Sequence, residues 1–289
     1  MTETLEYIIE QYDLPCSVGG YLQRRGFSRG LLRSLRASGG VSVDGVFRRM
    51  IEPLDAGEHL RVAMPEAVTP LVAAPALDLE ILYEDGQMVV INKPDDMLVH
   101  PAGRGFDDAV GNFYAARWPQ LLFRPIGRLD RHTSGCCLIA KNRPAAALLS
   151  GHVDKLYFGV VEGRVELEQG VIDAPLLRVP GRQIKRVVGA GGKPSRTAYR
   201  VLRRYEGYSL LCLRLFSGRT HQIRAHLAHI GHPLCGDALY GGGLRLIARQ
   251  ALHCGQLSLR SPADGRRIIV NAPLPADMAA LLTSASAQR

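Results

Sequence analysis

From residue 88 to residue 271 one short apolar run follows another, and few stretches between them have helical periodicity. The runs typical of strands are 88–92, 136–140, 156–161, 197–202, 209–216 and 267–271, whereas helical stretches are confined to 107–117, 143–151 and 221–230. Parallel neighbours need long crossover connections that usually contain a helix, and this region has too few helices to supply them. The sequence therefore predicts an α+β domain built on a mixed, largely antiparallel sheet.

The length and composition indicate an ordinary globular protein. A chain of 289 residues predicts about two domains, and 46% hydrophobic with 22% charged residues excludes extensive disorder. No apolar run approaches the roughly 18 residues that suit a membrane helix, and the acidic start lacks the features of a secretory signal. The six cysteines form no C-x-x-C pair and are expected to be reduced thiols (Cys16, Cys136, Cys137, Cys212, Cys235, Cys254). We therefore expect a cytoplasmic protein that has no membrane partner.

The N-terminal region is strongly basic. Residues 20–50 hold seven arginines and one aspartate, and the formal net charge of the chain is +9, which favours a nucleic-acid partner. Leucines at helical spacing follow Ser28, a candidate N-cap; Gly39-Gly40 ends that helix, and the strand 41–43 leads into the turn Asp44-Gly45.

Two short helices followed by a small hairpin resemble the alpha-L RNA-binding fold. The candidate RNA contacts in this module are Arg24, Arg25, Arg29 and Arg33, and a solvated basic face is the alternative. Residues 65–76 are rich in proline and alanine, which is typical of a linker. The predicted organisation is an RNA-binding domain over 1–64, a linker over 65–76 and a second domain over 77–289.

A polar loop, GRLDRHTSG, occupies residues 127–135, directly before the apolar strand 136–140. Loops at strand ends often carry functional side chains. Asp130 is the only carboxylate of this segment, and nearby Arg128, Arg131 and His132 favour its anionic form. Asp130 is therefore a candidate nucleophile, while a turn with an Asx-type hydrogen bond is the structural alternative.

A second polar segment, SGRTHQIRAHL, spans residues 217–227 and joins a strand to a helix. Its loop and first helical turn suit phosphate binding, because free N–H groups and basic side chains meet there (Arg219, Thr220, His221, Gln222). Arg224 lies at the edge of the apolar stripe of the helix. An arginine at such a position is expected to pair with a carboxylate such as Asp130.

Three further segments have ordinary structural interpretations. KLYFGVVEG at 155–163 predicts a strand on which Tyr157 could be a half-buried core residue. The histidines and cysteine of 221–235 lack the spacing of a zinc motif, so no metal site is predicted. The loop 189–195 lacks the order of a P-loop, and a hairpin turn is favoured there.

Taken together, these segments closely resemble the RluA family of pseudouridine synthases. The resemblance runs from about residue 77 to 278 and rests on INKP at 91–94, VHP at 99–101, the segments 127–135 and 155–163, and SGRTHQIRAHLAHIGHPLCGDALYGG at 217–242. The sequence departs from many members at Asp96, Gly127 and Ser195. None of these departures involves the aspartate, tyrosine or arginine that the family uses.

The resemblance implies roles for individual residues. Asp130 matches the catalytic aspartate, and Arg224 matches the arginine that pairs with it. Tyr157 matches the tyrosine that packs on the target base and takes the proton from its C5. Arg128 matches the residue that fills the space of the flipped uridine, and His132 and Thr133 of the same loop are further candidate RNA contacts.

The isomerisation of uridine to pseudouridine agrees with these residue types. It breaks the bond between base and sugar and rejoins the same uracil through carbon, so neither cofactor nor metal is expected. The carboxylate either attacks the anomeric carbon or removes a ribose C2′ proton, and both routes stay open.

The sequence leaves the target RNA open. Large-subunit ribosomal RNA is the expected substrate, and transfer RNA is the alternative. A catalytically silent RNA-binding protein on the same fold is disfavoured by Asp130, Tyr157 and Arg224. A carboxylate glycosidase is disfavoured by the lack of an obvious second acid. We expect a monomer without an obligate protein partner.

Overall fold

The computed structural model of the chain describes residues 4–27, 29–63, 71–101, 108–179, 181, 184–283 and 287–288. The chain divides into two compact units, 1–70 and 71–289, here called the N-terminal and C-terminal units. In the described ranges no helix is both long and apolar enough to cross a membrane. The six cysteines are free thiols, and four of them are buried.

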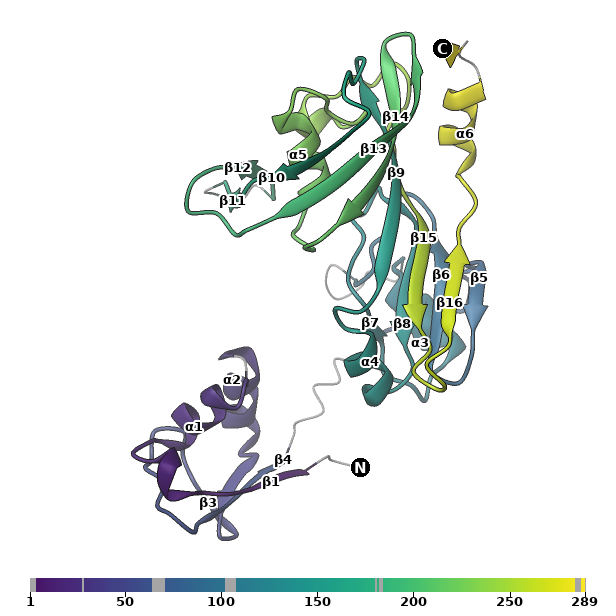
Figure 1. Ribbon diagram of the computed structural model, residues 1–289. Helices are drawn as coiled ribbons and strands as arrows, with labels where there is room; N and C mark the ends of the chain where they lie inside the picture. Colours follow the sequence, from purple (N-terminus) through teal and green to yellow (C-terminus); the bar gives the residue numbers. More distant parts are fainter. Residues whose placement is uncertain are drawn as a thin grey trace. The chain divides into compact units, whose positions relative to one another are not determined.

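The N-terminal unit contains two helices and a small sheet (Figure 1). Its elements are β1 (Thr4–Ile8), η1 (Gln11–Asp13), α1 (Val18–Arg24), α2 (Arg29–Ser38), β2 (Val41–Val43), β3 (Val46–Phe47) and β4 (His59–Ala63), with sheet order β1-β4-β2-β3. The predicted turn between β2 and β3 is present, since Asp44 and Gly45 have φ of 48° and 81°. Tyr21, Leu22 and Leu35 of the helices lie in one core with the strands.

The succession of helix, helix and hairpin is therefore confirmed, whereas β1 was not predicted. Ser28, the candidate N-cap, lies outside the described residues. Of the predicted linker 65–76, residues 65–70 lie outside the described residues. Within its second half, Val72 accepts a hydrogen bond from the buried Asn112 at 2.8 Å, and Ala74 donates one to the carbonyl of Asn112 at 3.2 Å. The end of the predicted linker thus packs onto the C-terminal unit.

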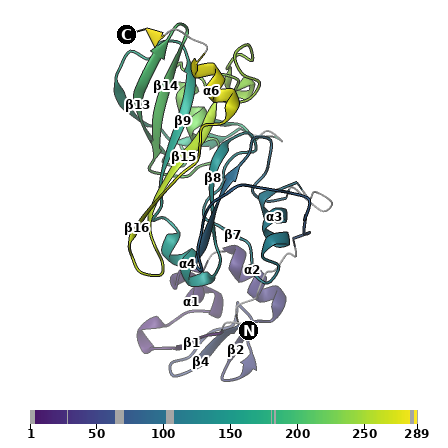
Figure 2. The same cartoon turned by 90° about the vertical axis from the view of Figure 1, so that its right-hand side faces the viewer.

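One large sheet organises the C-terminal unit (Figures 1 and 2). Its main order is β10-β13-β14-β9-β15-β8-β6-β5, formed by Gln169–Asp173, Arg196–Tyr205, Tyr208–Leu215, Asp154–Glu162, Leu252–Arg260, Ser134–Ala140, Met88–Lys93 and Ile81–Glu84. Three further strands branch from this order: β16 (Arg267–Asn271) pairs with β15, β7 (Arg124–Pro125) with β8, and β17 (Ala287–Gln288) with β13. β11 (Leu176–Arg178) and β12 (Arg186–Val188) form a separate hairpin. The prediction of a mixed, largely antiparallel sheet is confirmed, because among the described strands only β8 and β15 run parallel.

Helices cover the sheet at a few places. α3 (Val110–Arg117), α4 (Arg143–Leu149) and α5 (Gln222–His229) lie within the predicted stretches, while α6 (Ala276–Thr283) and the short η2 (Ala238–Tyr240) were not predicted. α6 packs its Met278 and Leu281 against Val160 of β9 and Tyr208 of β14 (Figure 2). α5 lies against β13 and the β12 hairpin.

The parallel pair of β8 and β15 lies in the middle of the sheet and begins at the end of the polar loop 127–133. Gly135 is paired with Cys254 and has a φ of +105°. A Cβ atom at Gly135 would lie 2.2 Å from the carbonyl oxygen of Cys254, so only glycine lets the two strands approach this closely. This contact fixes where the loop enters the sheet.

Candidate active site

Segments that are far apart in the sequence line one cavity of the C-terminal unit. They are the loop before β8, strand β9, the end of β14, the loop into α5 and the start of β15. The lining residues are Arg128, Leu129, Asp130, Thr133, Tyr157, Leu215, Arg219, His221, Gln222, Ile223, Arg224 and Leu252. Asp130 is the one carboxylate among these lining residues.

Asp130 is positioned by a turn in which the N–H of Thr133 donates to the Asp130 carbonyl at 3.0 Å. Its side chain is 27% exposed, so it remains accessible from the cavity. Arg224 Nη1 lies 3.5 Å and His221 Nε2 lies 3.9 Å from Asp130 Oδ2. Both groups come from the second polar segment, as the predicted pairing of Arg224 with Asp130 requires.

The arginines next to Asp130 in sequence have other partners. Arg131 pairs with Asp96 at 2.6 Å, and Arg128 donates to Thr220 Oγ1 at 3.2 Å. In the structure Asp130 is therefore ion-paired with Arg224 rather than with these neighbours in sequence. The cationic side chain nearest to Asp130 in the described structure is instead that of Arg224 on α5.

Arg224 has a second and closer carboxylate partner that sequence reasoning missed. Its Nε and Nη2 donate to Asp237 Oδ2 and Oδ1, each at 2.7 Å, and both residues are buried. Such two-pronged pairing is the strongest arrangement of an arginine with a carboxylate. The only available signal was the presence of one acid in the apolar segment 233–240.

Local backbone geometry brings Asp237 and His221 to their places. Gly236, with a φ of +77°, passes so close to Arg249 that a Cβ atom would lie 1.9 Å from its carbonyl oxygen. His221 caps α5 with a φ of +55°, which is rare for a residue with a side chain. Its Nδ1 lies 3.1 Å from the hydroxyl of Tyr240. Burial lowers the pKa of His221, which favours its neutral form.

Tyr157 lies on β9 between Leu213 of β14 and Cys254 of β15. Its side chain is almost completely buried, at 5% exposure, yet it lines the cavity. Burial, together with the neighbouring Cys254 thiol, raises the pKa of Tyr157 well above its usual value. The cavity therefore contains a carboxylate, a buried guanidinium and a neutral phenol within one site.

Comparison with known proteins identifies the family. Residues 87–229 match the family model described as RNA pseudouridylate synthase. The uncharacterized RNA pseudouridine synthase YjbO of Bacillus subtilis is 36% identical over 92% of this chain and 98% of that protein. This chain belongs to the RNA pseudouridine synthases. It is an isomerase that converts uridine in RNA to pseudouridine, and its relatives place it with the RluA type.

Other relatives agree with this assignment. Ribosomal large subunit pseudouridine synthase D of Haemophilus ducreyi is 38% identical over 71% of this chain and 70% of that protein. The structure of human RNA Pseudouridylate Synthase Domain Containing 1 aligns with a TM-score of 0.60 and 28% identity, covering 73% of this chain and 89% of that one.

The predicted RNA contacts of the synthase fall into two groups. Arg128 and Arg219 are exposed, and His132 and Thr220 are half-buried, so all four can reach a ligand. Thr133, His221 and Gln222 are buried. The Gln222 amide accepts from Arg219 N–H and donates to Arg196 O and Thr197 Oγ1, each at 3.0 Å. Gln222 therefore stabilises the loop. Thr133, His221 and Gln222 also line the cavity, so their contact with RNA stays a prediction.

The predicted contacts of the N-terminal unit are mostly on its surface. Arg24, Arg25 and Arg33 are exposed, while the side chain of Arg29 is not described. Arg24 donates to the carbonyl of Asp13, and the Arg25 guanidinium lies 5.0 Å from the ring centre of Tyr21. Arg24 and Arg25 are therefore held in place on the surface of the N-terminal unit.

The histidines of the second polar segment have protein partners rather than a shared metal geometry. His226 Nδ1 lies 2.9 Å from Thr197 Oγ1, and its Nε2 lies 3.0 Å from the Ala174 carbonyl. Across the described part of the chain no group of three or more His, Cys, Asp or Glu side chains is arranged to hold a metal ion.

Proposed function

We propose that the synthase modifies uridines of large-subunit ribosomal RNA and that Asp130 is its catalytic carboxylate. The observation that carries the catalytic part is the position of Asp130 as the one carboxylate lining the cavity, 27% exposed and 3.5 Å from the buried Arg224. The RNA target is supported by relatives named for the large ribosomal subunit, of which the Haemophilus ducreyi protein is one.

Asp130 starts the reaction as an anion. It either attacks C1′ of the target ribose, displacing the uracil as an N1 anion, or removes the C2′ proton as the same bond breaks. Uracil then turns and bonds to C1′ through C5. On the first route the ester bond between Asp130 and C1′ breaks in this step, and on the second route Asp130 returns its proton to C2′. The C5 proton then leaves and N1 is protonated. Atoms balance without a cofactor, and the proton lost from C5 passes to water.

Tyr157 supports the ring of the target base by stacking. Its raised pKa means that the phenol is neutral near pH 7. A neutral phenol can hold the uracil and exchange a hydrogen bond with it, but it is a weak base. The raised pKa therefore favours stacking and proton relay over direct removal of the C5 proton by a phenolate.

Arg128 occupies the gap that the target uridine leaves in its RNA stack. In the free protein Arg128 is exposed at the cavity. Its guanidinium donates a hydrogen bond of 3.2 Å to the hydroxyl of the half-buried Thr220. Breaking that hydrogen bond costs little, because the net contribution of a hydrogen bond to stability is about 1 kcal/mol. Base extrusion costs a few kcal/mol, which an inserted arginine offsets in part.

The N-terminal unit holds RNA phosphates through its exposed arginines, as its charge and its resemblance to the alpha-L fold suggest. The synthase acts as a monomer in the cytoplasm, where ribosomal RNA is available. A substrate in transfer RNA is the alternative outcome of the target experiment.

The test has two parts. With uridine tritiated at C5, wild-type protein should release tritium from RNA, and Asp130→Asn should release it at less than about a hundredth of that rate. A faster Asp130→Asn variant would contradict the catalytic assignment. Position-resolved pseudouridine mapping of cells with and without the gene should then show lost sites in large-subunit RNA; losses confined to transfer RNA would contradict the proposed target.

A further inference from the structure

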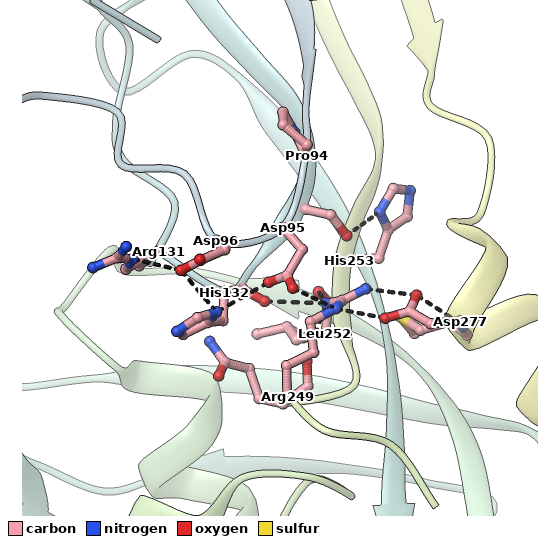
Figure 3. A network of polar contacts seen from close by, with 12 residues as sticks. Pro94, Asp95, Asp96, Arg131, His132, Arg249, Leu252, His253 and Asp277 are labelled. Carbon is pink, nitrogen blue, oxygen red and sulfur yellow. Dashed lines mark hydrogen bonds and ion pairs between the residues drawn. The ribbon is translucent and has the colours of Figure 1, made fainter. Parts of the chain in front are cut away.

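A second buried arginine, Arg249, lies on the far side of the loop that carries Asp130. It is 6% exposed, comes just before β15, and does not line the cavity. Figure 3 shows its guanidinium between His132 of the loop and Asp277 at the start of α6. The cluster of Arg249, Asp277, Asp95 and His132 is here called the Arg249 network.

All three nitrogens of the Arg249 guanidinium donate hydrogen bonds. Nε and Nη2 donate to the two carboxylate oxygens of Asp277 at 2.7 and 2.9 Å. Nη1 donates to the backbone carbonyl of His132 at 3.0 Å and to that of Gln250 at 3.2 Å, and it lies 3.5 Å from that of Leu252. Arg249 thus connects α6, the start of β15 and the loop 127–133.

A second buried cation holds the neighbouring peptide of the same loop. The Nζ of Lys93, which is fully buried, donates to the Arg131 carbonyl at 2.8 Å and to the carbonyls of Pro94 and Met97. Burial lowers the pKa of Lys93 to about 8. The carbonyls of the two residues that follow Asp130 are therefore each fixed by a buried cation.

Asp95, two residues after the end of β6, completes the network. Its carboxylate lies 3.1 Å from His132 Nδ1 and 3.6 Å from Arg249 Nε. His132 is in this way held at its backbone by Arg249 and at its ring by Asp95. A buried guanidinium needs compensating charge, and Asp277 supplies it in a two-pronged pair.

We propose that Arg249 and Asp277 are positioning residues that set the orientation of the Asp130 carboxylate through the backbone of His132. Neither residue touches the cavity, so their effect on the reaction passes through the loop. Because Asp277 belongs to α6, the C-terminal helix takes part in building the active site. This inference rests on the proposed role of Asp130.

Misplacing a reacting group by about 1 Å can cost a hundredfold in rate. Arg249→Lys keeps the charge but cannot reach Asp277 and His132 together, and it should lower kcat about a hundredfold. Asp277→Asn keeps the shape and removes the charge, and it should lower kcat about tenfold. In both variants the KM for RNA should stay within about threefold of wild type, because the candidate RNA contacts Arg128, Arg219 and Thr220 have other partners than Arg249 and Asp277.

Arg204 offers a matched control in the same protein. It donates to the carbonyls of Val165 and Glu166 at 2.8 and 3.0 Å and pairs with Glu168 at 2.6 Å, yet none of these residues lines the cavity. Arg204→Lys should lower the melting temperature while keeping kcat within about twofold of wild type. A loss of kcat in Arg204→Lys as large as in Arg249→Lys would show that the effect is general loss of stability.

The decisive measurement is the single-turnover rate at saturating RNA for the full chain, corrected for the folded fraction. If Arg249→Lys does not fold, Asp277→Asn alone carries the test. A wild-type kcat in Asp277→Asn, or equal losses in kcat and RNA affinity, would overturn the inference. Asp130→Asn is measured alongside: activity there contradicts the proposed function, whereas an inactive Asp130→Asn with a fully active Asp277→Asn contradicts only the positioning role.

Discussion

The buried pair of Arg224 and Asp237 makes a quantitative prediction about stability. Arg224→Met leaves the Asp237 carboxylate, which is 2% exposed, without its two hydrogen bonds of 2.7 Å. Removing one partner of a buried ion pair costs about 3–5 kcal/mol. For a unit of this size each kcal/mol lowers the melting temperature by about 2–4 °C, so we expect a loss of about 6–20 °C.

Removing both charges should destabilise the fold less than removing one. In Arg224→Met combined with Asp237→Leu no buried charge is left unpaired in that pair, and most of the lost stability should return. Asp130→Asn, which alters only a 3.5 Å contact of a partly exposed carboxylate, should shift the melting temperature by less than about 3 °C. Thermal unfolding followed by circular dichroism compares the wild type with Arg224→Met, Asp237→Leu, the double variant and Asp130→Asn.

The same measurements can contradict the pairing of Arg224 with Asp237. If the double variant is as unstable as the sum of Arg224→Met and Asp237→Leu, the two residues do not interact as the geometry requires. If Asp130→Asn costs as much as Arg224→Met, then Asp130 rather than Asp237 is the main partner of the arginine.

Three further predictions follow from the site and the charge distribution. Tyr157→Phe keeps the ring and removes the hydroxyl, so turnover should fall about a hundredfold with KM nearly unchanged; a wild-type rate would limit Tyr157 to stacking. Burial lowers the pKa of His221, His226 and His253 below the ordinary value of about 6.5, so the unfolded chain binds protons before the folded chain does, and the free energy of unfolding should decrease as the pH is lowered through about 6.5. His226→Gln should weaken that pH dependence in thermal unfolding, and a flat profile in the wild type would contradict it. Replacing exposed Arg24, Arg33, Arg36 and Arg49 together by glutamine should lower the log–log salt slope of RNA binding by about three, and an unchanged slope would make the N-terminal basic face a solvated one.

Local patterns in the sequence predicted much of the sheet and failed where strands lose their regular alternation. β9, β13 and β14 were found because apolar residues alternate along them. β15 was missed although it lies in the middle of the sheet. Gly255 interrupts its pattern, and the register with β9 shifts between Cys254 and Gln256. Its residues are buried on both faces as well, so no polar face marks it as a strand.

The candidate site shows the same limit at the level of side chains. Asp130, Tyr157 and Arg224 stand in recognisable segments, and the structure brings all three to one cavity. Asp237 and Arg249 could not be assigned from the sequence, because the partner of a buried charge depends on the folded chain. Gln222 and Thr133 were predicted to contact RNA, and their burial beside the cavity could not be inferred from their polar side chains.

The distribution of charge around Asp130 suits a carboxylate that must lose its charge during the reaction. On either of the two routes proposed for Asp130, its carboxylate becomes neutral, as an ester or as an acid. If Arg224 depended on Asp130 alone, that step would leave a buried guanidinium unpaired, at a cost of several kcal/mol. Asp237 already neutralises Arg224 through two hydrogen bonds, while Asp130 lies farther away at 3.5 Å. The arginine can therefore attract the anionic Asp130 in the free enzyme and remain paired when Asp130 reacts.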